Sequence, residues 1–221
     1  MKRNNKATIV REYGPFPGIE QVAGVSHDGS QVWFASGTQL NALDPDSGKI
    51  VRSFDLPAHA GTAFDGQHLF QIAEDHLQKI DPASGRVLST IPAPGGGCSG
   101  MAWAEGTLWV GLHRERKIVQ IDPQTGVVLR TIASNRFVTG VSWVDGDLWH
   151  ATWEGEESEL RRVDPETGET LEALEMPAGA NISGLESDGA DRFYCGGGGR
   201  AVIRAVQRPR RSVAGKARTA S

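Results

Sequence analysis

One repeated turn constrains this chain more than any other feature of its sequence. The turn has the form Asp-Pro-x-Ser/Thr-Gly and occurs four times, at residues 44–48, 81–85, 122–126 and 164–168. A glycine-led segment precedes each of these turns and occurs once more near the end of the chain. The five leading glycines lie 37, 39, 40 and 44 residues apart: Gly24, Gly61, Gly100, Gly140 and Gly184. Repetition at such a period indicates stacked copies of one supersecondary unit.

Each unit is predicted to contain four short strands. The leading glycine opens the first strand, a tight turn leads into the second, and the Asp-Pro turn joins the third to the fourth. In that turn proline fixes φ after the aspartate, and glycine supplies the positive φ that closes it. Four strands per unit without a helical pattern are typical of propeller blades. We therefore predict an all-β fold, a five-bladed β-propeller of four-stranded blades, with units starting near residues 19, 57, 95, 136 and 179.

The two ends of the chain complement each other. The last unit has a third strand at residues 201–207 but no fourth strand after it, whereas residues 7–18 resemble the fourth strands of other units. A strand at 7–13 is predicted to complete the fifth blade, which closes the ring and leaves no unpaired terminal edge. Residues 1–207 are expected to form a single domain. Residues 208–221 carry five basic residues and no acid, so we expect a disordered tail.

Several conspicuous aromatic residues are explained by the repeat. One aromatic recurs in the second strand of every unit, which predicts packing between blades. This set consists of Trp33, Phe70, Trp109, Trp149 and Phe193. Trp103 and Trp143 occupy equivalent positions in the innermost strands and are also predicted to be core residues. Trp153 belongs to neither set.

Composition excludes some classes of function. The chain has 221 residues, a formal net charge of −4 and 38% hydrophobic residues, which is ordinary for a soluble protein. No run approaches the roughly 18 apolar residues of a membrane span, and the basic start lacks the apolar stretch of a secretory signal. Two cysteines suit a reducing compartment. We expect a cytoplasmic monomer with no membrane partner and, because the body is acidic, no specific nucleic-acid partner.

Function is predicted to lie at one mouth of the central channel. Loops between blades, and loops from second to third strands, share one face and vary freely, and variable loops on a rigid frame are where function is usually placed. The candidates for a catalytic role are His59, Cys98 and Glu74. The candidates for ligand binding are Trp153, His113, Arg114, Gln21, Asn181, His76, Glu154 and Arg200.

Four alternative readings of these loops remain open. His59 could activate a Cys98 nucleophile, or Cys98 could be a small buried residue. A zinc-type divalent metal site could use His59, His76 and His113 with Glu74, although their spacing is not a motif. The glycine run 195–200 could hold a phosphate or be a flexible loop. The acidic segment 154–159 could bind a cation or form a solvated loop tip.

The chain resembles the plant and bacterial type of glutaminyl cyclase (glutaminyl-peptide cyclotransferase). The five-blade count, the N-terminal closing strand and the Asp-Pro turns carry the likeness, together with the fourth-blade run 143–169, in which Trp153 matches a tryptophan that lines that family's active site. Much of this pattern is shared with YVTN-type repeats.

The likeness does not extend to the family's catalytic acids. The family places polar and acidic residues immediately before the leading glycines. Here those positions are all small and hold Ala23, Ala60, Ser99, Thr139 and Ser183. Small residues at these positions are expected to widen the channel mouth into a pocket.

Three functions are compatible with the sequence. The first is binding, with or without chemical transformation, of a small polar molecule at the channel mouth. The second is pyroglutamate formation, as the resemblance implies, which needs a group that moves a proton from the attacking amine to the leaving ammonia. The third is a non-catalytic scaffold for a protein partner.

Overall fold

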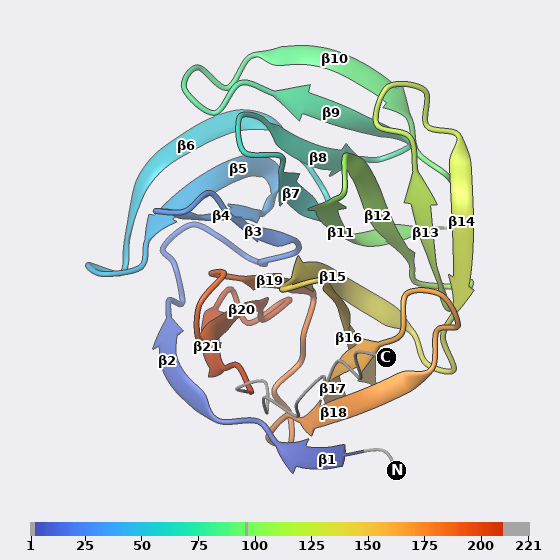
Figure 1. Ribbon diagram of the computed structural model, residues 1–221. Coiled ribbons are helices and arrows are strands. Elements are labelled where there is room, and N and C mark those ends of the chain that lie inside the picture. The colour runs from blue at the N-terminus through green and yellow to red at the C-terminus, as the bar shows by residue number, and fades with distance from the viewer. Residues whose placement is uncertain (1–2, 96, 210–221) are drawn as a thin grey trace, which may run out of the picture.

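The computed structural model describes residues 3–95 and 97–209, and the chain folds into five β-sheets arranged around a central axis (Figure 1). The first blade contains β3 (Val25–His27), β4 (Val32–Ala35), β5 (Gly37–Asp44) and β6 (Lys49–Ala58), and the second contains β7 (Thr62–Phe64), β8 (Leu69–Ala73), β9 (His76–Ile80) and β10 (Val87–Pro92). The third contains β11 (Cys98–Ala104), β12 (Thr107–Leu112), β13 (Lys117–Ile121) and β14 (Val128–Ala133). The fourth contains β15 (Val138–Val144), β16 (Asp147–Glu154), β17 (Glu157–Val163) and β18 (Thr170–Glu175). The fifth contains β19 (Gly184–Ser187), β20 (Arg192–Gly196) and β21 (Ile203–Gln207), and its outer strand is β2 (Ile9–Tyr13).

The predicted closure of the ring is confirmed. β2 pairs antiparallel with β21, with Ile9 opposite Val206 and Tyr13 opposite Ile203. A strand that the sequence did not suggest, β1 (Arg3–Lys6), pairs parallel with β18 and adds a fifth strand to the fourth blade (Figure 1). The N-terminal segment therefore binds two neighbouring blades in succession. In residues 3–95 and 97–209 there is no helix long and apolar enough to cross a bilayer.

The leading glycines form a ring in which successive blades meet backbone to backbone. A Cβ atom on Gly100 would lie 2.4 Å from the nitrogen of Val141 and 2.5 Å from the Cα of Gly140 in the next blade. Equally short approaches, of 2.4 to 2.6 Å to backbone atoms, occur at the other four positions of the ring: Gly24, Gly61, Gly140 and Gly184. Distances this short exclude any side chain, so the repeat requires glycine here.

Arginines on the outer strands connect three of the blades to the Asp-Pro turn of the next one. Arg11 donates to the carbonyl of Pro45 at 2.7 Å, and Arg52 donates to the carbonyl of Pro82 at 2.6 Å. Arg130 makes the same contact with the carbonyl of Pro165 at 3.1 Å. The Asp-Pro turns thus serve as docking points between blades as well as hairpin connections, a role that their local sequence did not reveal.

The second-strand aromatics pack between blades as predicted in the first four blades. Trp33, Phe70, Trp109 and Trp149 are 1–3% exposed. The ring of Trp103 stacks on Phe70, and that of Trp143 stacks on Trp109, each at 5.5 Å between ring centroids.

The fifth blade differs from this prediction. Glu186 pairs with Tyr194 where Ser142 pairs with Trp149, so Tyr194, rather than Phe193, occupies the repeated position. Tyr194 stacks on His27 of the first blade at 5.7 Å, whereas the fully buried Phe193 contacts Trp149.

The first residue of the predicted tail, Arg208, contacts the propeller. Arg208 donates to the carbonyl of Ala190 at 2.7 Å through Nε and lies 2.6 Å from the carboxylate of Asp145 through Nη1. This residue is therefore anchored to the fourth and fifth blades, which corrects the assignment of residue 208 to a disordered segment. Residues 210–221 of that predicted tail lie outside the described residues.

Candidate functional site

A pocket of about 330 Å³ lies at the channel mouth, on the face that carries the variable loops. Its lining is formed by Ala23, His59, Ala60, Gly97, Cys98, Ser99, His113, Arg114, Thr139, Trp153 and Ser183. All five residues that precede the leading glycines belong to this set, so the small side chains do open a cavity above the glycine ring. Five of the sequence candidates also meet here: His59, Cys98, His113, Arg114 and Trp153. Their roles in binding or catalysis stay predictions.

The small residues around the axis also hold neighbouring blades together. The hydroxyl of Ser99 donates to the carbonyl of Val138 in the next blade at 2.7 Å. The hydroxyl of Ser183 donates to the carbonyl of Ala23 across the ring closure at 2.9 Å. Thr139 is 5% exposed, and its hydroxyl has no hydrogen-bond partner within the described part of the chain. Two of the three hydroxyls therefore have structural partners, and their serines stabilise the cavity walls.

His113 is held in a fixed orientation. Its ring stacks on Phe137 at 4.8 Å, and Nδ1 lies 3.2 Å from the carbonyl oxygen of Val138. Because a carbonyl can only accept, Nδ1 carries the proton in this contact and Nε2 is the nitrogen left for another partner. Arg116 covers the Phe137 ring at 4.3 Å from its centroid. Phe137 is thus a supporting residue that the sequence analysis missed, because nothing in its local sequence distinguishes it from an ordinary loop aromatic.

Trp153 lies near the end of β16 and is 37% exposed. Its indole nitrogen donates to the carbonyl of Gly155 in the same hairpin at 2.7 Å. The polar edge of the ring is therefore satisfied locally, and its apolar face remains the part that can contact a ligand.

The surroundings of Cys98 do not favour a thiolate. Burial raises the pKa of its thiol to about 11, and the charge of Glu115 acts in the same direction. The thiol donates to the carbonyl of Gly95 at 3.5 Å, and no hydrogen bond joins it to His59 among the described residues. A neutral thiol is a poor nucleophile, so this geometry gives no support to a Cys98–His59 pair.

The remaining candidates do not line this pocket. Glu74 occupies an exposed turn at a positive φ of 57°, and His76 lies 3.0 Å from the carboxylate of Asp75. Arg200 and Gln21 are exposed outside the pocket, while Asn181 contributes its main-chain carbonyl to Arg204 at 3.2 Å. Within residues 3–95 and 97–209 no three His, Cys, Asp or Glu side chains are placed to hold a metal ion. The suggested grouping of His59, His76 and His113 with Glu74 is therefore wrong.

The glycine run 195–200 does not form a phosphate cradle. The amide of Gly197 donates to the carbonyl of Val202 at 2.8 Å, and the amide of Gly198 donates to the carbonyl of Val22 at 3.0 Å. The amide of Arg200 is also used within the loop, 3.3 Å from the carbonyl of Gly197. An anion site needs amide groups that point outward without partners, and here three amides of the run already donate to main-chain carbonyls.

The acidic segment 154–159 forms ion pairs, while residues 155–157 at its tip are exposed to solvent. Glu154 lies 3.5 Å from Arg116 and accepts a hydrogen bond from the amide of Phe137 at 3.0 Å. Glu157 lies 3.3 Å from Arg136, and Glu159 lies 2.5 Å from the buried Arg161. This network joins the third and fourth blades, so Glu154 supports the wall of the pocket and does not line it.

Comparison with known proteins places the chain among propellers. A sequence model of the family described as "Outer membrane protein assembly factor BamB" matches residues 22–162, which is more than half of the chain. The chain belongs to this family. The matched segment of this BamB-type propeller runs from the first blade into the third strand of the fourth blade. No curated protein matches the chain.

Solved structures of several propellers share this fold. The crystal structure of Myxococcus xanthus glutaminyl cyclase is 17% identical, with a TM-score of 0.79, and the match covers 94% of this chain and 98% of that one. The β-propeller domain of Myceliophteria thermophila Cps50 (Swd1) is 9% identical, with a TM-score of 0.58, covering 92% and 100%. Kuenenia stuttgartiensis hydrazine synthase is 17% identical, with a TM-score of 0.52, covering 80% and 56%. The resemblance to glutaminyl cyclase that the sequence indicated is therefore confirmed for the fold.

Proposed function

We propose that this protein binds a small polar molecule that carries an anionic group, such as a carboxylate, in the pocket at the channel mouth. The observation that carries the proposal is the sign of the charge on the pocket lining. Arg114 supplies a cation and His59 and His113 supply imidazoles, and no carboxylate accompanies them in the described lining. A cavity of about 330 Å³ with a few converging polar groups is typical of a small-molecule site.

The geometry suggests how such a ligand would lie. Arg114 supplies a planar set of donors that suits a carboxylate, and the free Nε2 of His113 can accept a hydrogen bond from a hydroxyl or amine of the same molecule. The exposed face of Trp153 would pack against the apolar part of the molecule. Because Phe137 and Val138 already fix the His113 ring, little conformational entropy is lost on binding.

The same lining argues against cyclisation of an N-terminal glutamine. That reaction needs a group that accepts a proton from the attacking amine and delivers it to the departing ammonia, and no carboxylate lines the described pocket. We expect a peptide with N-terminal glutamine to release no ammonia above its spontaneous rate in the presence of this protein. Clear turnover would show that an imidazole of the lining, or a group outside it, performs the transfer.

Calorimetric titration with a panel of small carboxylates, each paired with its neutral amide, tests the binding proposal. A carboxylate should bind more tightly than its amide, and Arg114→Gln should weaken carboxylate binding by about tenfold through the lost charge-assisted hydrogen bond. Arg200→Gln is the matched control, because it changes an exposed loop arginine of another blade that lies outside the pocket. Equal binding of carboxylates and amides, or equal effects of the two variants, would contradict the proposal.

A further inference from the structure

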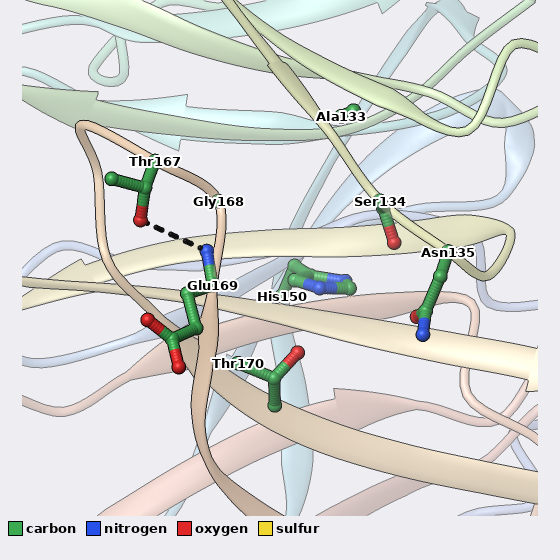
Figure 2. Close-up of a pocket in the computed structure, with 8 residues that line it drawn as sticks. All are labelled: Ala133, Ser134, Asn135, His150, Thr167, Gly168, Glu169 and Thr170. Atoms are coloured by element: carbon green, nitrogen blue, oxygen red, sulfur yellow. Dashed lines mark hydrogen bonds between the residues drawn. The ribbon is translucent and has the colours of Figure 1, made fainter.

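A second cavity of about 410 Å³ lies between the third and fourth blades, away from the channel-mouth residues (Figure 2). Its lining is formed by Ala133, Ser134, Asn135, His150, Thr167, Gly168, Glu169 and Thr170. None of these residues lines the first pocket. Apart from Ala133 and Gly168, every lining residue has a polar side chain, so the cavity offers several hydrogen-bond partners to a ligand.

The cavity forms where the Asp-Pro turn of the fourth blade docks on the end of β14. The turn approaches so closely that a Cβ atom on Gly168 would lie 2.4 Å from Cγ2 of Ile132. Within the turn, the hydroxyl of Thr167 accepts a hydrogen bond from the amide of Glu169 at 3.2 Å (Figure 2). This docking holds Glu169 and Thr170 opposite Ser134 and Asn135, with the ring of His150 between them in the view of Figure 2.

His150 is the unusual member of this set. It occupies the second-strand position that holds Phe34, Gln71, Val110 or Cys195 in the other blades, and its side chain is almost fully buried. Nδ1 lies 3.3 Å from the carbonyl oxygen of Ala151, so Nδ1 carries the proton. Nε2 then presents a lone pair, and it has no hydrogen-bond partner among the residues that the structure describes. Burial lowers the pKa of His150 to about 4, and the neighbouring Arg161 adds to this effect.

The buried cation beside the cavity is already paired. Arg161, which lies opposite His150 on β17, donates through Nε to Glu159 at 2.6 Å and through Nη1 to the side-chain oxygen of Asn135 at 2.6 Å. Its guanidinium is therefore not available to bind an anion. The same contact fixes the amide of Asn135, because only the oxygen can accept from arginine, and this leaves the amide nitrogen as a donor.

We propose that this cavity binds a neutral, hydroxyl-rich small molecule of the sugar or polyol class. One ligand hydroxyl would donate to Nε2 of His150, and others would bond to the amide nitrogen of Asn135 and to the hydroxyls of Ser134 and Thr170. An anion would meet the lone pair of Nε2 without a compensating cation. A cation would find only the exposed carboxylate of Glu169, which is screened by solvent. Hydroxyl groups, which both donate and accept, match this mixed set.

Saturation-transfer NMR on the full chain tests the proposal, with a panel of hexoses, pentoses and myo-inositol at millimolar concentration. Acetate and methylammonium serve as charged comparators. At least one sugar or polyol should show transfer that the comparators lack, and amide shifts in ¹⁵N spectra should centre on residues 134–135, 150 and 167–170. The absence of transfer from every sugar and polyol would overturn the proposal.

Two variants localise the binding. His150→Phe installs the residue that the first blade has at the same position, and Thr170→Val removes a hydroxyl while keeping the shape of the side chain. Each should weaken binding, His150→Phe by about tenfold. Trp153→Ala, in the other pocket, should leave it unchanged, which separates this site from the proposed function at the channel mouth. Binding that survives both cavity variants, or that Trp153→Ala abolishes, would place the ligand elsewhere and refute the proposal.

Discussion

Two tryptophans on one strand, four residues apart, should differ strongly in how much stability the protein loses when each is replaced by alanine. Trp149 is 3% exposed and packs with Leu160 and Leu185, and its ring centroid is 4.9 Å from that of Phe193. Trp149→Ala removes this burial and leaves a cavity, so the free energy of unfolding should fall by roughly 3–5 kcal/mol. Trp153 is 37% exposed and makes one hydrogen bond at the surface. Trp153→Ala should lower the free energy of unfolding by about 1 kcal/mol or less.

Urea unfolding followed by far-UV circular dichroism measures both effects, because that signal does not depend on the tryptophan that is removed. The midpoint should shift strongly for Trp149→Ala and slightly for Trp153→Ala, with similar slopes. Titration of the folded Trp153→Ala protein with the carboxylate panel should show weakened binding. A Trp153 variant as unstable as the Trp149 variant would make Trp153 a core residue. A stable Trp153 variant with unchanged affinity would remove it from the site.

Three further predictions follow from the propeller fold. Gly100→Ala should lower the free energy of unfolding by more than about 3 kcal/mol, because its Cβ would meet backbone atoms that cannot move aside. Gly199→Ala, which has open space around it, should change the free energy of unfolding measured in urea very little. Burial raises the pKa of Glu186 from 4.5 to about 7, so between these pH values the folded protein holds a proton that the unfolded chain has lost. The free energy of unfolding should therefore fall as pH rises through this window, by on the order of 3 kcal/mol. Urea melts of wild type and Glu186→Gln across the window measure this effect. A difference in unfolding free energy between the two proteins that does not change with pH would refute it. Deleting residues 1–14 should give insoluble or strongly destabilised protein, because β21 loses its outer partner; a melting temperature within a few degrees of full length would contradict the closure.

The fold was predictable because its turns have a chemistry that the sequence displays directly. Each Asp-Pro turn is closed by its own side chains, as where Asp44 accepts from the amide of Asp46 at 2.9 Å, and glycine at a positive φ ends it. β1 was not predictable, because it joins β18 through main-chain hydrogen bonds that almost any sequence can form. The register of the fifth blade was misread because its first turn is one residue longer, which moves Tyr194 into the place assigned to Phe193.

The candidate site was predictable only as far as the repeat determines position. The residues beside the leading glycines converge on the axis in every blade, and the second-to-third loops of the third and fourth blades reach the same pocket, so His59, His113 and Trp153 were found. The direction of Glu74 depends on a left-handed turn that its sequence does not reveal. The pairing of Glu154 with Arg116 joins segments of two different blades. Contacts of that kind depend on how blades are inclined to each other, which no local pattern encodes.

The ring of leading glycines has a consequence for protein engineering. Its contacts are made by backbone atoms alone, and the pocket residues Ala60, Ser99 and Thr139 stand directly before three of its glycines. The floor of the channel-mouth pocket is therefore independent of the side chains that would recognise a ligand. Each blade contributes its own two loops above this floor, and a loop can be exchanged without disturbing the backbone contacts of the glycine ring. Libraries that vary these loops while keeping the glycines should yield folded proteins with new ligand preferences.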